Sequence, residues 1–109
     1  MNEIRIRSQK LTNAKVHFIG VGGIGMCGLA ELLHNMGARV SGSDSTENSQ
    51  TIRLREMGVL IFIGQRPEQV GDAEVVVYSS AIKSHNPEYR EARRKGIPLI
   101  PRAEALAEM

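Results

Sequence analysis

The sequence predicts an α/β fold in which a parallel, doubly wound sheet carries helices on both faces. Short apolar runs alternate along the chain with longer segments of helical spacing, and the clearest run, residues 74–78, contains three consecutive valines. Strands that alternate with helices form parallel sheets, and strands buried on both faces are continuously apolar. A length of 109 residues and an apolar fraction of 41% suit one domain with its own core.

The first half of the chain is predicted to contain three strands and two helices. The strands are expected over 16–19, 39–43 and 59–63, and the helices over 24–36 and 50–57. Apolar residues at helical spacing support both helices (Leu29, Leu32, Leu33 and Met36 in the first, Ile52 and Leu54 in the second). Gly37 and Gly58 follow these helices, as glycine often does at a helix C-terminus.

The second half is predicted to add two strands, over 74–78 and 98–100, and two helices. Pro67–Val70 suits a single helical turn. Asn86 is a good helix cap and Pro87 suits the first helical position, so a helix should run from there to Gly96. A last helix is expected over 103–108. Right-handed crossovers favour the strand order 3-2-1-4-5, with a ligand site between the first and fourth strands.

Composition excludes several classes of partner. The 14 Lys and Arg residues nearly balance 12 Asp and Glu residues, and the net charge of +2 is too small to indicate nucleic acid or an anionic membrane. A single cysteine, Cys27, cannot form an internal disulfide, which suits a reducing compartment. The first ten residues lack the apolar stretch of a secretory signal. We therefore expect a soluble, cytoplasmic protein.

The strongest motif is the segment Gly20-Val21-Gly22-Gly23-Ile24-Gly25, which matches G-x-G-x-x-G between a strand and a helix. Gly20 would permit a tight turn, Gly22 would leave room for a phosphate, and Gly25 would allow close packing of the helix. Backbone N–H groups at the positive end of a helix stabilise an anion. The sequence therefore predicts a Rossmann-like domain that binds the diphosphate of a nucleotide.

Two further loops should meet the glycine motif at the same edge of the sheet. Asp44 ends the second strand, where an acid accepts hydrogen bonds from ribose hydroxyls in dinucleotide-binding proteins; capping of its own loop or of the next helix is the alternative. Residues 79–82 end the fourth strand and offer small hydroxyl groups. His17 lies within the first strand, a position more typical of a packed histidine than of a catalytic one.

Signs of catalysis are absent from the sequence. It contains no G-x-x-x-x-G-K-[ST] motif for ATP, no Cys and His set with metal-ligand spacing, and no recognisable pair of nucleophile and base. We therefore expect the chain to bind a ligand without performing chemistry by itself.

The segment 17–44 resembles the start of the Mur ligases. Further matches follow in the same order: Phe62-Ile63-Gly64, Val77–Ile82, Asn86-Pro87-Glu88 and Pro101-Arg102-Ala103-Glu104. The resemblance covers about residues 15–109, which it implies are the UDP-substrate-binding domain, with residues 1–14 as an N-terminal extension. The central ATP-binding domain and the C-terminal domain of the family would be missing, so we expect a fragment that binds but does not ligate.

Within this family, the chain is most similar to the ligases that join L-alanine to UDP-N-acetylmuramate in peptidoglycan precursor synthesis. The resemblance implies UDP-N-acetylmuramate as ligand, with ATP and Mg²⁺ used by the full-length enzyme, through an acyl phosphate, and no cofactor held by this part. It also implies the ligand-contacting residues: Gly22, Gly23, Ile24, Gly25 and Met26 around the diphosphate, Ser43 and Asp44 at the uridine, Ser79, Ser80, Ala81 and Ile82 at the diphosphate and amino sugar, and Arg102 near the substrate.

One position departs from the family pattern. Gln65 stands where many relatives carry His, and its amide can both donate and accept towards a uracil edge. Three alternatives stay open. The first is the family branch that attaches a recycled tripeptide to the same nucleotide sugar, in which Thr usually replaces Ile24. The others are an NAD-binding domain of a dehydrogenase and a nucleotide-sensing regulator of a transporter, because fold alone does not decide between them.

Overall fold

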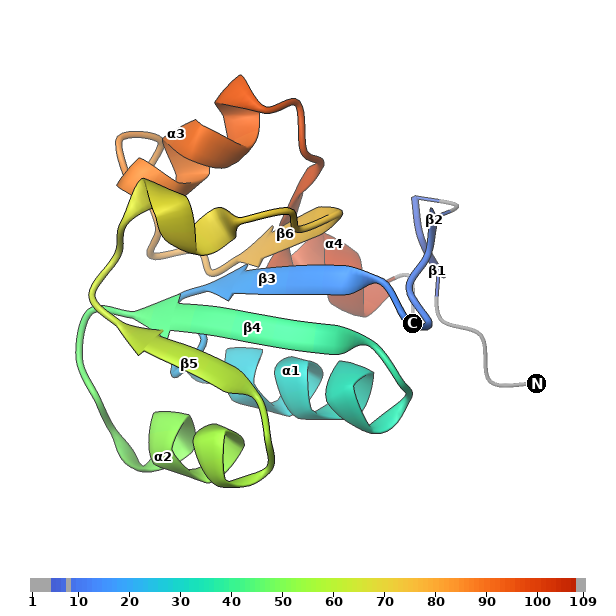
Figure 1. Cartoon of the computed structure of the whole chain (residues 1–109), viewed down its shortest axis with the longest axis vertical. Coiled ribbons are helices and arrows are strands. Elements are labelled where there is room, and N and C mark those ends of the chain that lie inside the picture. Colours follow the sequence, from blue (N-terminus) through green and yellow to red (C-terminus); the bar gives the residue numbers. More distant parts are fainter. Residues whose placement is uncertain (1–4, 8, 108–109) are drawn as a thin grey trace.

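The computed structural model describes residues 5–7 and 9–107 and is built around a five-stranded parallel sheet (Figure 1). The strands lie in the order β5 (Leu60–Ile63), β4 (Arg39–Asp44), β3 (Lys15–Ile19), β6 (Val75–Tyr78) and β7 (Leu99–Pro101). This is the predicted order 3-2-1-4-5, and all four neighbouring pairs are parallel. The chain reverses its direction of winding between β3 and β6, where the ligand site is expected.

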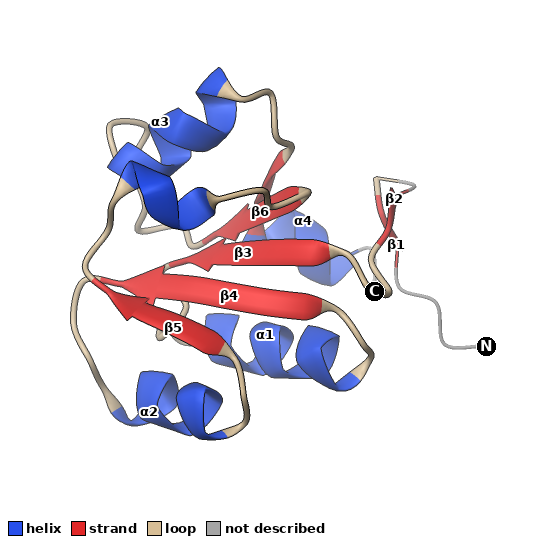
Figure 2. Ribbon diagram, viewed as in Figure 1, coloured by secondary structure: helices blue, strands red, loops and turns tan. Residues whose placement is uncertain are grey.

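Helices cover both faces of the sheet, as predicted (Figure 2). One face carries α1 (Met26–Asn35), α2 (Ser49–Glu56) and α4 (Arg102–Ala107), and the other carries the 3₁₀ turn η1 (Pro67–Val70) and α3 (Pro87–Arg94). The valines of β6 divide between the faces, because Val75 and Val77 join the large core with α1 whereas Val76 packs under α3. Within the described ranges, no helix has the length and apolar character needed to cross a membrane.

Two helices differ in detail from their predictions. The first begins at Met26 rather than Ile24, because Gly25 has φ +83°, which is outside the right-handed helical region. Leu32 and Ile52, expected on buried faces, are 43% and 41% exposed. The buried stripe of α1 runs through Met26, Leu29, Ala30 and Leu33, and that of α2 through Thr51 and Leu54. Packing against the sheet fixed the rotation of each helix, which apolar spacing alone left open.

The predicted cap of α3 is confirmed. The Asn86 side chain accepts hydrogen bonds from the backbone N–H groups of Glu88 and Tyr89, and Pro87 occupies the first helical position. The helix α2 has a comparable start that was not predicted: the Asn48 side chain accepts from Thr51 N, while Thr51 Oγ1 accepts from Asn48 N. Part of the last predicted helix, residue 108, lies outside the described residues.

Described residues of the expected N-terminal extension, 1–14, pack against the domain. A two-stranded antiparallel hairpin, β1 (Arg5–Ile6) and β2 (Gln9–Lys10), precedes the sheet. Ile6 and Leu11 are each 1% exposed and pack in the same cluster as Phe18. The sequence does not predict that these two side chains are buried, because two isolated apolar residues form no helical or strand periodicity.

Candidate functional site

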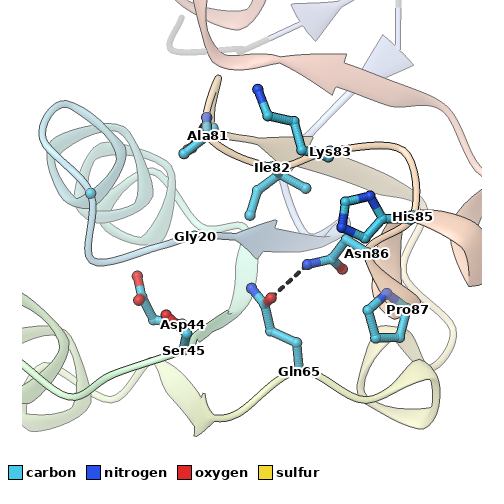
Figure 3. Close-up of a pocket in the computed structure, with 12 residues that line it drawn as sticks. Gly20, Asp44, Ser45, Gln65, Ala81, Ile82, Lys83, His85, Asn86 and Pro87 are labelled. Carbon is cyan, nitrogen blue, oxygen red and sulfur yellow. Dashed lines mark hydrogen bonds between the residues drawn. The ribbon is translucent and has the colours of Figure 1, made fainter.

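A pocket of about 470 Å³ opens at the carboxyl ends of the strands, beside the reversal point between β3 and β6. Three loops of the predicted site contribute to it, together with the start of α3 (Figure 3). Its lining residues are Gly20, Gly23, Asp44, Ser45, Gln65, Ser79, Ala81, Ile82, Lys83, His85, Asn86 and Pro87. The position is the one that the topology predicts for a ligand.

The glycine loop, residues 20–25, is held mainly by backbone hydrogen bonds. Gly20 N and Val21 N both donate to Ser43 O at 2.9 Å, and Gly23 N donates to Gly20 O at 3.1 Å. Within the described chain, the N–H groups of Ile24 and Gly25 donate to no other residue. Ile24 is also fully exposed. The loop therefore presents two backbone donors at the N-terminal end of α1, where an anion is favoured.

Gly22 has a packing role that its position in the motif does not predict. A methyl group at Gly22 would lie 2.9 Å from Thr51 Cγ2 and 3.0 Å from both Asn48 Nδ2 and Asp44 Oδ2. The missing side chain thus makes room for the start of α2 and for Asp44. The predicted contact of Gly22 with a phosphate stays a prediction.

The backbone conformation favours glycine at position 25, where φ is +83°. A methyl group there would lie 2.9 Å from Arg102 Nη1, at the end of a flexible side chain. The guanidinium of Arg102 therefore lies against the glycine loop, at the same helix end as the two available N–H groups. The sequence placed Arg102 near the substrate only by resemblance; the structure places its positive charge beside the predicted diphosphate position.

The structure favours the alternative role of Asp44. Its Oδ2 accepts a 2.8 Å hydrogen bond from Gly22 N, and its Oδ1 accepts a longer one, 3.4 Å, from Thr46 N. Asp44 therefore fixes the glycine loop and its own turn. The residue also lines the pocket, so a carboxylate oxygen with remaining acceptor capacity can meet a ligand hydroxyl.

The loop after β6 lies against the glycine loop. Ser79 Oγ accepts from Ala81 N at 3.1 Å, and a methyl group at Gly20 would lie 3.2 Å from Ser79 Cβ. Ser79, Ala81 and Ile82 line the pocket, whereas Ser80 is exposed and is not among the lining residues. Figure 3 shows this loop on the side of the pocket opposite Asp44.

Two residues of the pocket lining were missed by sequence reasoning. Lys83 and His85 are exposed residues that line the pocket next to Ile82 and Asn86. The Lys83 ammonium adds a positive charge to that of Arg102 at the glycine loop, which suits an anionic ligand. Both residues lie within six positions of Ser79, but an isolated lysine or histidine in a loop usually faces solvent.

Two predicted contact residues have buried side chains. Met26 is fully buried, and its N–H donates to Gly23 O at 3.0 Å. Ser43 is also fully buried, and its hydroxyl donates to Glu88 Oε1 at 2.8 Å. In this structure, these side chains support the site from behind and do not reach the pocket, because each faces the interior of the domain.

Glu88 is fully buried and is the centre of a largely buried polar network. Its Oε1 lies 2.6 Å from His17 Nε2 and accepts from Ser43 Oγ, while its Oε2 accepts from Gln69 Nε2 at 2.7 Å and Arg66 N at 3.1 Å. His17 Nδ1 lies 2.8 Å from Ser41 Oγ, so both ring nitrogens have partners. His17 is therefore the packed histidine that its place in a strand predicted.

This network reaches the pocket through Gln65. Gln65 Nε2 lies 3.5 Å from Ser43 Oγ, and Gln65 Oε1 accepts a 2.5 Å hydrogen bond from Asn86 Nδ2 (Figure 3). We call Gln65 and Asn86, with the buried network behind them, the polar wall of the pocket.

One titratable group near the site has an altered pKa. Burial raises the pKa of Tyr78, at the end of β6, and the neighbouring Tyr89, whose ring meets it edge to face at 5.1 Å, adds to the effect. Within residues 5–7 and 9–107, no group of three or more His, Cys, Asp or Glu side chains could hold a metal ion. The site thus offers hydrogen-bond donors and positive charge to a ligand.

The profile of the Mur ligase family, catalytic domain, matches residues 15–109. The chain belongs to the Mur ligase family. It is 69% identical, over 92% of its length, to the UDP-N-acetylmuramate–L-alanine ligase of Bdellovibrio bacteriovorus. This Mur ligase chain also resembles the crystal structure of UDP-N-acetylmuramate–alanine ligase MurC from Thermotoga maritima, with a TM-score of 0.82 and 34% identity over 84% of this chain and 21% of that one.

A second branch of the family is also similar. The UDP-N-acetylmuramate:L-alanyl-γ-D-glutamyl-meso-diaminopimelate ligase from Neisseria meningitides gives a TM-score of 0.79 at 28% identity, over 87% of this Mur ligase chain and 30% of that one. The chain spans only 22% of the length of the Bdellovibrio ligase that it matches.

Proposed function

We propose that this chain is the nucleotide-sugar-binding part of an ATP-dependent ligase that adds L-alanine to UDP-N-acetylmuramate, in bacterial peptidoglycan synthesis in the cytoplasm. One observation carries the proposal: a pocket with anion-binding groups lies at the sheet reversal point of a chain that is 69% identical to such a ligase. The tripeptide ligase is the second candidate, and its lower identity, 28% for the Neisseria structure, makes it the weaker one.

The geometry supports a diphosphate at the glycine loop. Two backbone N–H groups, at Ile24 and Gly25, meet the guanidinium of Arg102 there, and charge-assisted hydrogen bonds to phosphate are strong. The uridine would then extend along Asp44 towards the polar wall, and the sugar would extend towards the loop after β6, with Ser79, Ser80, Ala81 and Ile82. Lys83 adds a positive charge to this side of the pocket, and His85 adds an imidazole.

The sequence of this chain carries no glycine motif followed by lysine of the kind that binds ATP. The relatives are ligases, which generally use ATP and Mg²⁺. We propose that the remainder of a longer protein, corresponding to the unmatched length of the relatives, binds them and the amino acid. The present chain would hold and orient the nucleotide sugar and would not form the amide bond itself.

A ligand titration followed by NMR of the protein tests the proposal. We expect UDP-N-acetylmuramate and UDP to shift the amide signals of residues 22–26 and 79–82, while NAD⁺ leaves them in place. The opposite pattern would support the dehydrogenase or sensor alternative. An assay of ATP hydrolysis with L-alanine and UDP-N-acetylmuramate should show no turnover by this chain, and turnover would contradict the division of roles.

A further inference from the structure

The amide of Gln65 lies between the buried network and the pocket. It lines the pocket, and each of its two polar atoms has one protein partner: Ser43 Oγ for Nε2 and Asn86 Nδ2 for Oε1. A primary amide has two N–H donors and two acceptor lone pairs. One donor and one lone pair of Gln65 therefore remain for a ligand, and the orientation of the amide decides which occupies which position.

The buried side sets the orientation through Ser43. The Glu88 carboxylate accepts the Ser43 hydroxyl proton at 2.8 Å. The Ser43 oxygen has only one proton, so it can offer only lone pairs to Gln65. Gln65 must therefore direct Nε2, and not Oε1, towards Ser43. At 3.5 Å this contact is long and is the weaker of the two constraints.

The helix cap sets the same orientation independently. Asn86 Oδ1 accepts from Glu88 N at 2.9 Å and from Tyr89 N at 3.3 Å. Its oxygen is thereby committed to α3, and Asn86 must present Nδ2 to Gln65. Because Asn86 Nδ2 is a donor, Gln65 must direct its acceptor, Oε1, towards Asn86, and the two atoms lie 2.5 Å apart.

We propose that Glu88 is a positioning residue that, acting through Ser43 and together with the α3 cap, holds the Gln65 amide in one orientation and so makes the pocket select uracil over cytosine. The inference rests on the proposed function, namely that a uridine nucleotide occupies this pocket. Glu88 is fully buried and does not line the pocket, so it acts through its neighbours, and Ser43 is the neighbour whose side chain contacts both Glu88 and Gln65.

The two bases require opposite amide orientations. Uracil presents a ring N–H beside a carbonyl, whereas cytosine presents a bare ring nitrogen beside an amino group. An amide that rotates freely can pair with either base by exchanging its oxygen and nitrogen. An amide held in one orientation pairs with only one of the two bases. The other base would leave hydrogen-bonding groups of the base and of Gln65 without partners.

The test is the ratio of the UDP and CDP dissociation constants, measured by calorimetry for the 109-residue chain and two matched variants. We expect the unmodified chain to prefer UDP by about tenfold or more, as one lost pair of hydrogen bonds implies. Ser43→Ala removes the bond to Gln65 and should lower this preference by about threefold or more. Ser49→Ala makes the same change at the exposed start of α2, outside the pocket lining, where the hydroxyl contacts Gln50, and should leave the preference unchanged.

A second variant, Glu88→Gln, replaces a carboxylate that only accepts hydrogen bonds from Ser43 with an amide that can also donate to it. The Ser43 hydroxyl could then donate to Gln65 and favour the opposite orientation of the Gln65 amide. This variant should lower the preference at least as far as Ser43→Ala. If Glu88→Gln does not fold, the serine pair decides the question. An unchanged preference in Ser43→Ala, or an equal change in Ser49→Ala, would overturn the orientation lock while leaving uridine binding intact. Failure of the unmodified chain to bind UDP would instead refute the proposed function, and the inference with it.

Discussion

The two walls of the pocket are built differently. The glycine loop is shaped by backbone hydrogen bonds and by glycines at positions where a side chain would collide or strain the backbone. The polar wall depends on side chains that lie far apart in sequence, such as His17 and Glu88, which are 71 residues apart, and Ser43 and Glu88, which are 45 apart. A backbone wall offers donors that suit any phosphate, whereas a side-chain wall can distinguish one base from another.

The difference also predicts how each wall fails. A change in the glycine loop should act through steric overlap, which neighbouring residues can partly relieve. A change in the polar wall should act through buried polar groups left without partners, which nothing nearby can replace. Variants in the polar wall should therefore lose more stability than variants in the glycine loop.

The largest effect is expected for Glu88→Ala, which removes the acceptor shared by four buried or partly buried donors. We expect the free energy of unfolding to fall by about 3 kcal/mol or more, because each buried donor left without an acceptor costs about 1–3 kcal/mol. Urea denaturation followed by circular dichroism measures it. The control is Glu91→Ala, one turn later in α3, where the carboxylate pairs with Arg94 near the surface; an equal loss there would contradict the special role of the buried network.

The next largest effect is expected for Gly22→Val in the glycine loop. Its side chain would overlap Thr51 and Asn48 at the start of α2, so it should destabilise the fold by about 1–3 kcal/mol. The motif alone suggested lost ligand binding with an intact fold. Gly28→Ala is the matched control: nothing lies within 4 Å of a methyl group there, and alanine should stabilise α1 by about 0.5–1 kcal/mol. Thermal denaturation of both variants compares them.

Arg102→Ala should act on binding rather than on stability. Removal of the guanidinium beside Gly25 should weaken UDP binding by about tenfold, the equivalent of about 1.4 kcal/mol. Arg94→Ala, at the end of α3 and outside the pocket lining, serves as the control and should bind UDP normally. Calorimetric titration measures both, and equal affinities for the two variants would argue against a diphosphate at the glycine loop.

The smallest effect is expected outside both walls. The hydrogen bond from Arg94 holds the pKa of the Glu91 carboxyl below its ordinary value. Because the folded-state pKa is lowered, the stabilisation is complete above the ordinary carboxyl pKa and is lost as the pH falls through the lowered folded-state value. The pair is exposed to solvent, so the change in stability should be slight. NMR titration of the Glu91 carboxyl checks the direction, and Arg94→Ala should return the pKa towards its ordinary value.

Local patterns made much of this molecule predictable. The strand order followed from alternating periods and right-handed crossovers, and the glycine motif and the Asn86 cap were readable because each lies within a few consecutive residues. Asp44 was assigned to a ligand, yet it also closes the glycine loop through Gly22. The sequence could not distinguish these roles, since both require an acceptor at the same strand end.

By itself, the sequence determined the α/β class, the order of the strands, the place of the pocket and the family. These features depend on periodicity and short motifs, which neighbouring residues encode. Only the tertiary structure decided that Ile6 and Leu11 join the core, that Gly22 faces α2, and that Ser43 and Met26 face inward. It alone united His17, Ser43 and Glu88 behind Gln65, because a hydrogen bond between distant segments depends on where the sheet places their side chains and leaves no pattern along the chain.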